Sequence, residues 1–408
     1  MGQPLRFIHA ADLHLELPPL GLTEVPDHLR TLLIDAPFRA AERVFDAALK
    51  EHVDFLLLAG DVINPLACGP RGLVFLADQF ERLAAQSITV YWAGGPGDDF
   101  ERWLDAWPLP KNVVRFSLNR VTRFVHTRGG EPLAQILGTS STLDKKINVS
   151  EFRAAAGELF AIGVAHGIME LDSATWQEID YWALGGEHDR RTLASGPITA
   201  HYCGTCQGRS PAESGPRGCT LVTVDESRQV RSAFIETDAV RFEQQRLAVS
   251  DFATADQLAT ILGDRLTELT GDPFGPGLLI SWTLSGSDNT LRQLRHGHLA
   301  TDLVGRLRAA QAQKRPVVWT ISVGGETIDV ANAELLAEES VLGEFLRTVA
   351  HYAEHAEAEL SLEPFLAERH LAGTLAAELT IAEPSARRRL LAQVAELGSD
   401  LLGPQESA

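Results

Sequence analysis

The feature that most constrains the fold is a pattern that recurs through the first 240 residues. A short apolar run ends abruptly in a polar or ionisable residue, as in Phe55–Gly60 (FLLLAG), which Asp61 follows directly. Runs that are apolar throughout suit strands buried on both faces, and segments between them, such as residues 40–50 and 73–85, have helical spacing. The pattern predicts a layered α/β domain.

Ionisable side chains follow these runs at their carboxyl ends. The residues in question are Asp12, His14, Asp61, His166 and His188. Strand ends of this kind meet at one edge of an open α/β sheet. Carboxylates and imidazoles bind divalent transition metals, and one bridging carboxylate can hold two ions about 3.5–4 Å apart, as in phosphoester cleavage. The sequence therefore predicts a metal site, although a lone buried histidine is more often an ordinary core residue.

Four short motifs resemble the ordered motifs of the calcineurin-like metallophosphoesterases. They are Asp12-Leu13-His14, Gly60-Asp61-Val62-Ile63-Asn64, His166-Gly167 and Gly185-Gly186-Glu187-His188. The segments FIHAADLHLE, YWALGGEH and CGTCQGRSPAESGPRGCTLV are similar to the SbcD-type branch, the nuclease subunits of DNA double-strand-break repair complexes. The resemblance implies a metallophosphoesterase sandwich in residues 1–240, a small α/β capping domain in 241–330, and a helical partner-binding or packing segment in 331–408.

The resemblance also implies two sets of metal ligands. A first ion would take Asp12, His14, Asp61 and His188, all of which are present. A second ion would share Asp61 and take His166, together with an Asn and another His. We expect Mn²⁺ as the ion.

This chain departs from the family at the second ion. The family's Gly-Asn-His-Asp motif, which supplies the Asn ligand and the general-acid histidine, is replaced by Gly95-Pro96-Gly97-Asp98, and Gly186 replaces the other His. We therefore expect a weakened second site and no acid at Gly97. Asp98, Asp99, Glu187 and His201 are candidates to replace the missing ligand or acid.

The charge of the chain limits its partners. Its formal net charge of −19 opposes contact with nucleic acid unless a local cationic group reverses the field. Arg190 and Arg191 follow His188, and Arg209 and Arg217 lie in the Gly-, Ser- and Pro-rich stretch 205–218. These residues predict a cationic rim that binds phosphate oxygens; solvated loop arginines are the alternative.

The predicted function is metal-dependent phosphodiester hydrolysis, by a DNA repair exonuclease-like nuclease subunit. One alternative is a catalytically weak or inactive scaffold that partners an SbcC-type coiled-coil ATPase on DNA through the C-terminal helices. Another is a phosphomonoesterase or small-nucleotide hydrolase, since fold does not fix substrate. A homodimer is compatible with each of these.

The sequence has no run of about 18 apolar residues and no visible signal peptide, so we expect a cytoplasmic protein without a membrane span. Cys203 and Cys206, with Cys219 and His201, have either of two roles: neutral thiols in a loop and strand, or a zinc site.

Overall fold

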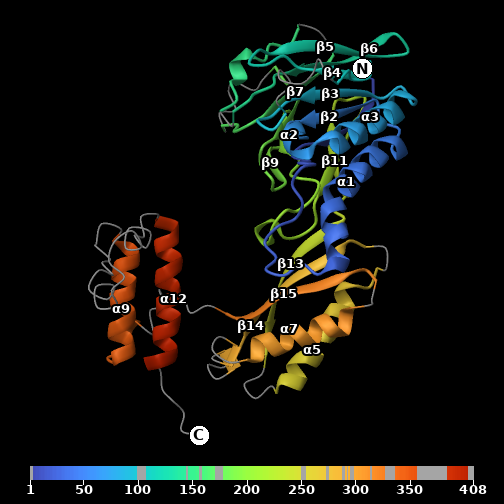
Figure 1. The fold of residues 1–408 in the computed structure, drawn as a ribbon. Helices are drawn as coiled ribbons and strands as arrows, with labels where there is room; N and C mark the ends of the chain where they lie inside the picture. The colour runs from blue at the N-terminus through green and yellow to red at the C-terminus, as the bar shows by residue number, and fades with distance from the viewer. Residues whose placement is uncertain are drawn as a thin grey trace. The chain divides into compact units, whose positions relative to one another are not determined.

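The computed structural model describes residues 3–98, 107–143, 146–155, 159–170, 178–249, 254–272, 275–286, 290–291, 293–294, 298–312, 315–326, 336–355 and 384–402. Its contacts divide the chain into two units (Figure 1). The first contains residues 1–245, 259–282 and 304–322, and the second contains residues 246–258, 283–303 and 323–408. The expected domain limits at residues 240 and 330 stay a prediction.

The first sheet of unit 1 has six strands, in the order β12-β11-β1-β2-β3-β4. Their bounds are β1 Leu5–Ala10, β2 Phe55–Ala59, β3 Thr89–Ala93, β4 Val113–Arg115, β11 Gly218–Val224 and β12 Val230–Glu236. Strands β1 to β4 are parallel, and β11 and β12 are antiparallel to their neighbours. Helices α1 (Asp27–Lys50) and α3 (Pro70–Ala84) bury apolar side chains such as Val44, Phe45 and Phe80 with those of β1, β2 and β3.

The second sheet also has six strands, in the order β5-β6-β7-β8-β10-β9. Their bounds are β5 Thr122–Arg128, β6 Glu131–Gly138, β7 Phe160–His166, β8 Tyr181–Gly185, β9 Arg191–Ala194 and β10 Thr199–Tyr202. Strands β6, β7, β8 and β10 are parallel. The two sheets share one core, in which the rings of Phe7 and Tyr181 lie 5.3 Å apart. The predicted layered α/β fold is confirmed.

Short elements join these strands near their carboxyl ends. Helix α2 (Pro65–Cys68) follows β2 and begins at Asn64, whose side chain accepts a hydrogen bond from the Ala67 N–H. Two short 3₁₀ turns, η2 (Val149–Glu151) and η4 (Pro211–Glu213), lie in the loops before β7 and β11. These loops, rather than the strands, carry most of the polar side chains discussed below.

A third sheet has the order β13-β14-β15, with bounds Val240–Ala248, Gly277–Ser285 and Val318–Gly325. Helices α5 (Ala255–Leu269) and α7 (Leu299–Gln311) lie between its strands in the sequence. In unit 2, α9 (Val341–Glu354) and α12 (Pro384–Leu402) pack through Leu342, Leu346 and Leu391. Residues 356–383 of the expected helical segment, and the candidate site residue Asp99, lie outside the described residues. Within the described ranges, no helix is long and apolar enough to span a membrane.

Candidate metal centre

The five predicted ligand residues come from four strand ends that belong to both sheets of unit 1. Asp12 and His14 follow β1, Asp61 follows β2, His166 is the last residue of β7, and His188 follows β8. The structure brings them together in two groups: ligand atoms of Asp12, His14 and His188 lie within 4.8 Å of one another, as do those of Asp12, Asp61 and His166. Asp12 is common to both groups.

Backbone conformation directs the side chains of the first two loops. Asp12, His14 and Asp61 have φ angles of 51°, 43° and 50°. Non-glycine residues rarely adopt this left-handed conformation, which costs on the order of 1–3 kcal/mol and is concentrated at functional sites. The two loops hold each other in place: the Asp12 N–H donates to Gly60 O at 2.9 Å, and the His14 N–H donates to Asp61 O at 3.0 Å.

The carboxylate of Asp12 is buried, and only one of its two oxygens has a hydrogen-bond partner among the described residues. Its Oδ2 accepts a hydrogen bond from the Gly186 N–H at 3.0 Å, and burial raises its pKa. Its Oδ1 has no hydrogen-bond partner among the described residues and lies 3.9 Å from His188 Nε2 and 4.0 Å from His166 Nδ1. His14 Nε2 is also buried without a hydrogen-bond partner there. Two such atoms in one cluster are suited to a bound cation.

Asp61 and His166 face each other across the second group. Asp61 Oδ2 lies 3.6 Å from His166 Nε2 and 3.8 Å from His14 Nε2. His166 Nδ1 is 3.0 Å from Ala59 O, and because a carbonyl oxygen only accepts, that nitrogen carries the proton. The lone pair of a neutral His166 therefore lies on Nε2, toward Asp61.

The loop of residues 95–98 supports this centre through its backbone. The Gly97 N–H donates to Asp61 Oδ1 at 2.8 Å. A Cβ at Gly95 would lie 2.4 Å from the same oxygen, so this position excludes a side chain. The glycines thus fix Asp61, although they supply no ligand atom of their own.

Asp98 is held by backbone donors beside the centre, and its candidacy as a replacement acid stays a prediction. Its Oδ1 accepts hydrogen bonds from the N–H groups of Val62 and Ile63, each at 2.9 Å, and its Oδ2 accepts from the Gly95 N–H at 3.0 Å. Burial and then the charge of Asp61 raise the pKa of Asp98 to about 7. This carboxylate ties the 95–98 loop to the loop after β2, and its acceptors are already engaged.

His201 does not lie in the centre either. It sits within β10, where its ring nitrogens hydrogen-bond to the hydroxyls of Thr192 and Thr220 at 3.0 and 2.9 Å. Burial, and then the charge of Arg190, lower the pKa of His201 to about 4. His201 is a buried polar core residue and is absent from both candidate ligand groups.

The remaining predicted site residues are Glu187, Arg190, Arg191, Arg209 and Arg217, and they differ in whether they contact a ligand histidine. Glu187 pairs with Arg191, and the guanidinium of Arg190 lies 5.4 Å from the ring centre of Phe234. Arg209, in contrast, contacts the His188 imidazole. Arg217 donates to His188 O at 2.7 Å, so of the four arginines in the predicted rim Arg209 is the one that contacts the side chain of a ligand residue.

The cysteines do not form the alternative zinc site in the described part of the chain. Cys203, Cys206 and Cys219 are free and buried, and burial raises the pKa of each thiol. None of them belongs to a group of three candidate ligands there. The interpretation as neutral thiols fits the structure.

Two glutamates that sequence reasoning missed contact ligand histidines. Glu16 Oε1 lies 3.3 Å from His14 Nδ1, and Glu213 Oε1 lies 2.9 Å from His188 Nδ1. Glu16 stands two residues after His14, and this short spacing is a signal that could have identified it. Glu213 lies 25 residues from His188, and only the folded chain brings the two together.

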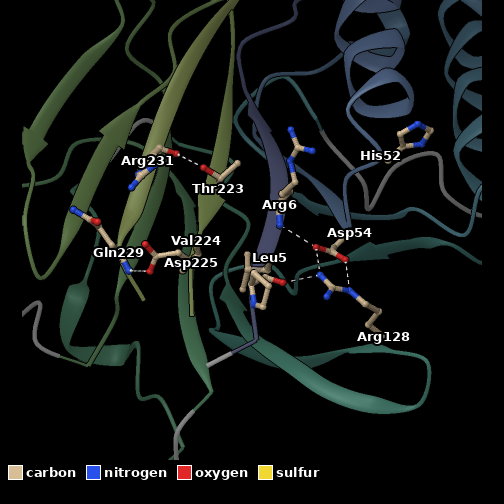
Figure 2. Close-up of a pocket in the computed structure, with 11 residues that line it drawn as sticks. Leu5, Arg6, His52, Asp54, Arg128, Thr223, Val224, Asp225, Gln229 and Arg231 are labelled. Carbon is tan, nitrogen blue, oxygen red and sulfur yellow. Dashed lines mark hydrogen bonds and ion pairs between the residues drawn. The ribbon is translucent and has the colours of Figure 1, made fainter. Parts of the chain in front are cut away.

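Unit 1 has one pocket beside the ligand cluster and another away from it. One, of about 80 Å³, adjoins His166 and is lined by polar side chains that include Asn119, Lys146 and Asn148. The other, of about 600 Å³, lies where β1 begins, whereas Asp12 follows the end of that strand (Figure 2). In Figure 2, Arg128 pairs with Asp54, which neutralises part of the charge of this second pocket.

Comparisons with known proteins agree with this geometry. Residues 5–197 match the family model of the calcineurin-like phosphoesterases. Metallophosphoesterase YhaO of Bacillus subtilis strain 168 is 28% identical over 349 residues, which cover 80% of this chain and 83% of YhaO. The chain is thus similar to a metallophosphoesterase over most of its length, and the match of residues 5–197 supports a phosphoesterase of this type.

Similar solved structures include a dimetal phosphatase from Danio rerio and the phosphoesterase YfcE from E. coli. The first is 8% identical with a TM-score of 0.35, over 56% of this chain and 98% of that one. The second is 12% identical with a TM-score of 0.27, over 57% of this chain and all of that one. Metallophosphoesterases use divalent metal ions, and the two candidate ligand groups of this chain fit that chemistry.

Proposed function

We propose that this protein is a metal-dependent phosphodiesterase, a DNA repair exonuclease-like nuclease subunit with an altered second-metal site. The observation that carries the proposal is the pair of buried atoms, Asp12 Oδ1 and His14 Nε2, that have no hydrogen-bond partner among the described residues. Leaving a buried polar atom unsatisfied costs about 1–3 kcal/mol. A divalent cation between these atoms would satisfy both.

The ligand set supports one strong ion site. Asp12, His14 and His188 would hold the first ion, and Asp61 Oδ2 lies close enough to His14 to complete the set. Two imidazoles and two carboxylates suit a first-row transition ion, and we propose Mn²⁺. When bound, such an ion lowers the pKa of its water toward about 7 and polarises a phosphoryl oxygen.

The second group supports a weaker site. Asp12, Asp61 and His166 remain, whereas Pro96 and Gly186 supply no ligand atom where the resembling family has two more ligands. Each lost ligand lowers metal affinity strongly. We therefore propose that one ion is held tightly and that His166 faces a weak second ion or the phosphate.

The missing acid determines which substrates turn over well. Gly97 cannot protonate a leaving group, and the Asp98 carboxylate is engaged by backbone donors. Losing a positioned general acid typically removes a factor of about 10²–10⁴ in rate. Because the leaving oxygen must then take its proton from water, phosphodiesters with acidic leaving groups should be hydrolysed much faster than DNA.

Arg209 is the proposed phosphate ligand of this centre. Its guanidinium lies beside His188 and within unit 1, where it can donate to the oxygens of a phosphodiester bound at the first ion. Such a local cation is needed, because the net charge of −19 opposes an anionic polymer. Arg190 and Arg191 would act only at the rim of the site.

The same proposal includes DNA as the substrate and an SbcC-type coiled-coil ATPase as the partner. It also includes a homodimer as the alternative assembly and a cytoplasmic location. The sequence resemblance over residues 1–240 supports DNA as the substrate. The packed pair of helices α9 and α12 offers a candidate segment for the partner, with exposed Val341 and Leu401.

The test combines metal analysis with hydrolysis assays. The purified protein is assayed with Mn²⁺ against DNA, bis(p-nitrophenyl) phosphate and p-nitrophenyl phosphate, with Asp61→Ala as the control for contaminating nucleases. We expect about one tightly bound ion per chain and Mn²⁺-dependent cleavage of the diesters. Faster cleavage of the monoester would overturn the diesterase assignment. Bound metal with no turnover of any substrate would favour the scaffold instead.

A further inference from the structure

The loop that precedes β11 contains a carboxylate that contacts two proposed functional groups at once. Glu213 ends the short turn η4, and its side chain is 15% exposed. Its Oε2 accepts a hydrogen bond from the Arg209 N–H at 2.7 Å, and its Oε1 accepts from Arg209 Nη2 at 3.1 Å. The same Oε1 lies 2.9 Å from His188 Nδ1. Glu213 thus joins the proposed phosphate ligand to a proposed metal ligand.

The tautomer of His188 decides whether this imidazole can bind a metal. A neutral imidazole has one N–H and one lone pair, and the nitrogen with the lone pair is the ligand. If Nδ1 donates to Glu213, the lone pair lies on Nε2, which is the nitrogen 3.9 Å from Asp12 Oδ1. If the proton moves to Nε2 instead, that nitrogen cannot bind the cation.

Arg209 competes with Glu213 for the Nδ1 nitrogen of His188. Its Nη2 lies within hydrogen-bond distance of both ring nitrogens of His188. Because a guanidinium only donates, a hydrogen bond from Arg209 to Nδ1 would require the lone pair there and place the proton on Nε2. Glu213 resolves this competition, since a carboxylate accepts from Arg209 and from an Nδ1–H at the same time.

The position of Glu213 suits this role. Its side chain is largely buried, and Arg209 donates a hydrogen bond to each of its two oxygens, which holds the carboxylate against Nδ1 of His188. Glu16 contacts His14 Nδ1 in the same way at the longer distance of 3.3 Å, so each histidine of the first group has a carboxylate behind it.

We infer that Glu213 is a positioning residue that holds His188 in its Nδ1-protonated form and anchors Arg209 beside it, so that cation binding and phosphate binding depend on one carboxylate. The inference rests on the proposed function, because it assigns a cation and a phosphate to this site. Outer carboxylate partners of metal-binding histidines typically change metal affinity by about 10–100-fold.

The first test compares Glu213→Gln with Asp189→Asn by isothermal titration with MnCl₂. Asp189 is the residue after His188, its side chain is 83% exposed, and it pairs with Arg217, so this control removes a nearby charge without touching the imidazole. We expect Glu213→Gln to weaken Mn²⁺ binding by about 10–100-fold and Asp189→Asn to leave it unchanged. A folded Glu213→Gln protein with wild-type Mn²⁺ affinity would overturn the inference.

The second test reads the tautomer directly and needs no stable Glu213 variant. In metal-free wild-type protein with ¹⁵N-labelled histidine, and with a His188→Gln sample for assignment, His188 should show a protonated Nδ1 and an unprotonated Nε2. The opposite assignment would refute the inference. Failure of the proposed function looks different: in that case the wild-type protein itself binds no Mn²⁺ or cleaves no phosphodiester.

Discussion

Replacing Asp12 by Asn should raise the stability of the metal-free protein and reduce the stabilisation that a bound metal ion provides. The buried Oδ1 of Asp12 has no hydrogen-bond partner among the described residues, whereas Oδ2 accepts from the Gly186 N–H. An asparagine of the same shape keeps the second contact through its amide oxygen and removes the buried charge. Without metal, the variant should therefore be at least as stable as the wild type, by up to about 1–3 kcal/mol.

With Mn²⁺ added, the wild-type protein should become more stable than the Asp12→Asn variant. A ligand present at 100 times its dissociation constant stabilises the folded state by about 2.7 kcal/mol. For a domain of this size, about 2–4 °C of Tm correspond to each kcal/mol, which gives a wild-type rise of roughly 5–11 °C. If the loss of Asp12 weakens binding about 100-fold, the same Mn²⁺ concentration supplies only about 0.4 kcal/mol, or about 1–2 °C.

The assay is a thermal melt with and without MnCl₂, followed by circular dichroism. Asp54→Asn is the matched control, because Asp54 pairs with Arg128 in the pocket at the start of β1, away from the ligand cluster. That variant should keep the full Mn²⁺-induced rise in Tm. If Asp12→Asn shows the wild-type rise, the cation does not lie between these side chains and the reasoning is refuted.

Three further predictions concern the framework around the centre. Gly185→Ala should lower Tm severely, because the new Cβ would lie 1.9 Å from Ala59 O, whereas Gly305→Ala in α7 meets no atom within 4 Å and should gain up to about 1 kcal/mol in a thermal melt. Asp98→Ala should cost at least about 3 kcal/mol in urea unfolding, because it leaves several buried N–H donors unsatisfied; a cost below about 1 kcal/mol would contradict its structural role. His201, with its pKa lowered to about 4, binds its proton more weakly in the folded chain than in the unfolded one, so its contribution is complete above pH 6.5 and decreases by about 3 kcal/mol as the pH falls to 4. Unfolding free energies of His201→Gln should show correspondingly less loss over that range.

The central strands could be predicted because both faces of each strand are buried. A segment such as FLLLAG is apolar throughout, so it must be buried on both faces of a sheet. The ionisable residue after it then lies at the sheet edge. That logic places Asp61 next to Asp12 without any knowledge of the loops. It also distinguishes His166, which ends its strand, from His201, which lies inside one.

The loop contacts could not be predicted in this way. The role of Asp98 depends on N–H groups from two loops that become neighbours only through the pairing of β2 with β3. Glu213 is one acidic residue in a stretch without periodicity, and nothing in its surroundings indicates His188. Such contacts depend on the geometry of turns, which the pattern of apolar and polar residues does not predict.

The left-handed backbone at Asp12, His14 and Asp61 has a consequence for laboratory evolution. Each of these positions gives up folding free energy to aim its side chain, and glycine would occupy the same φ angle with less strain. A library screened only for survival of heating, in the absence of divalent ions, should therefore accumulate replacements at these three positions. Thermostable variants of this protein are best sought with catalysis retained as a second criterion.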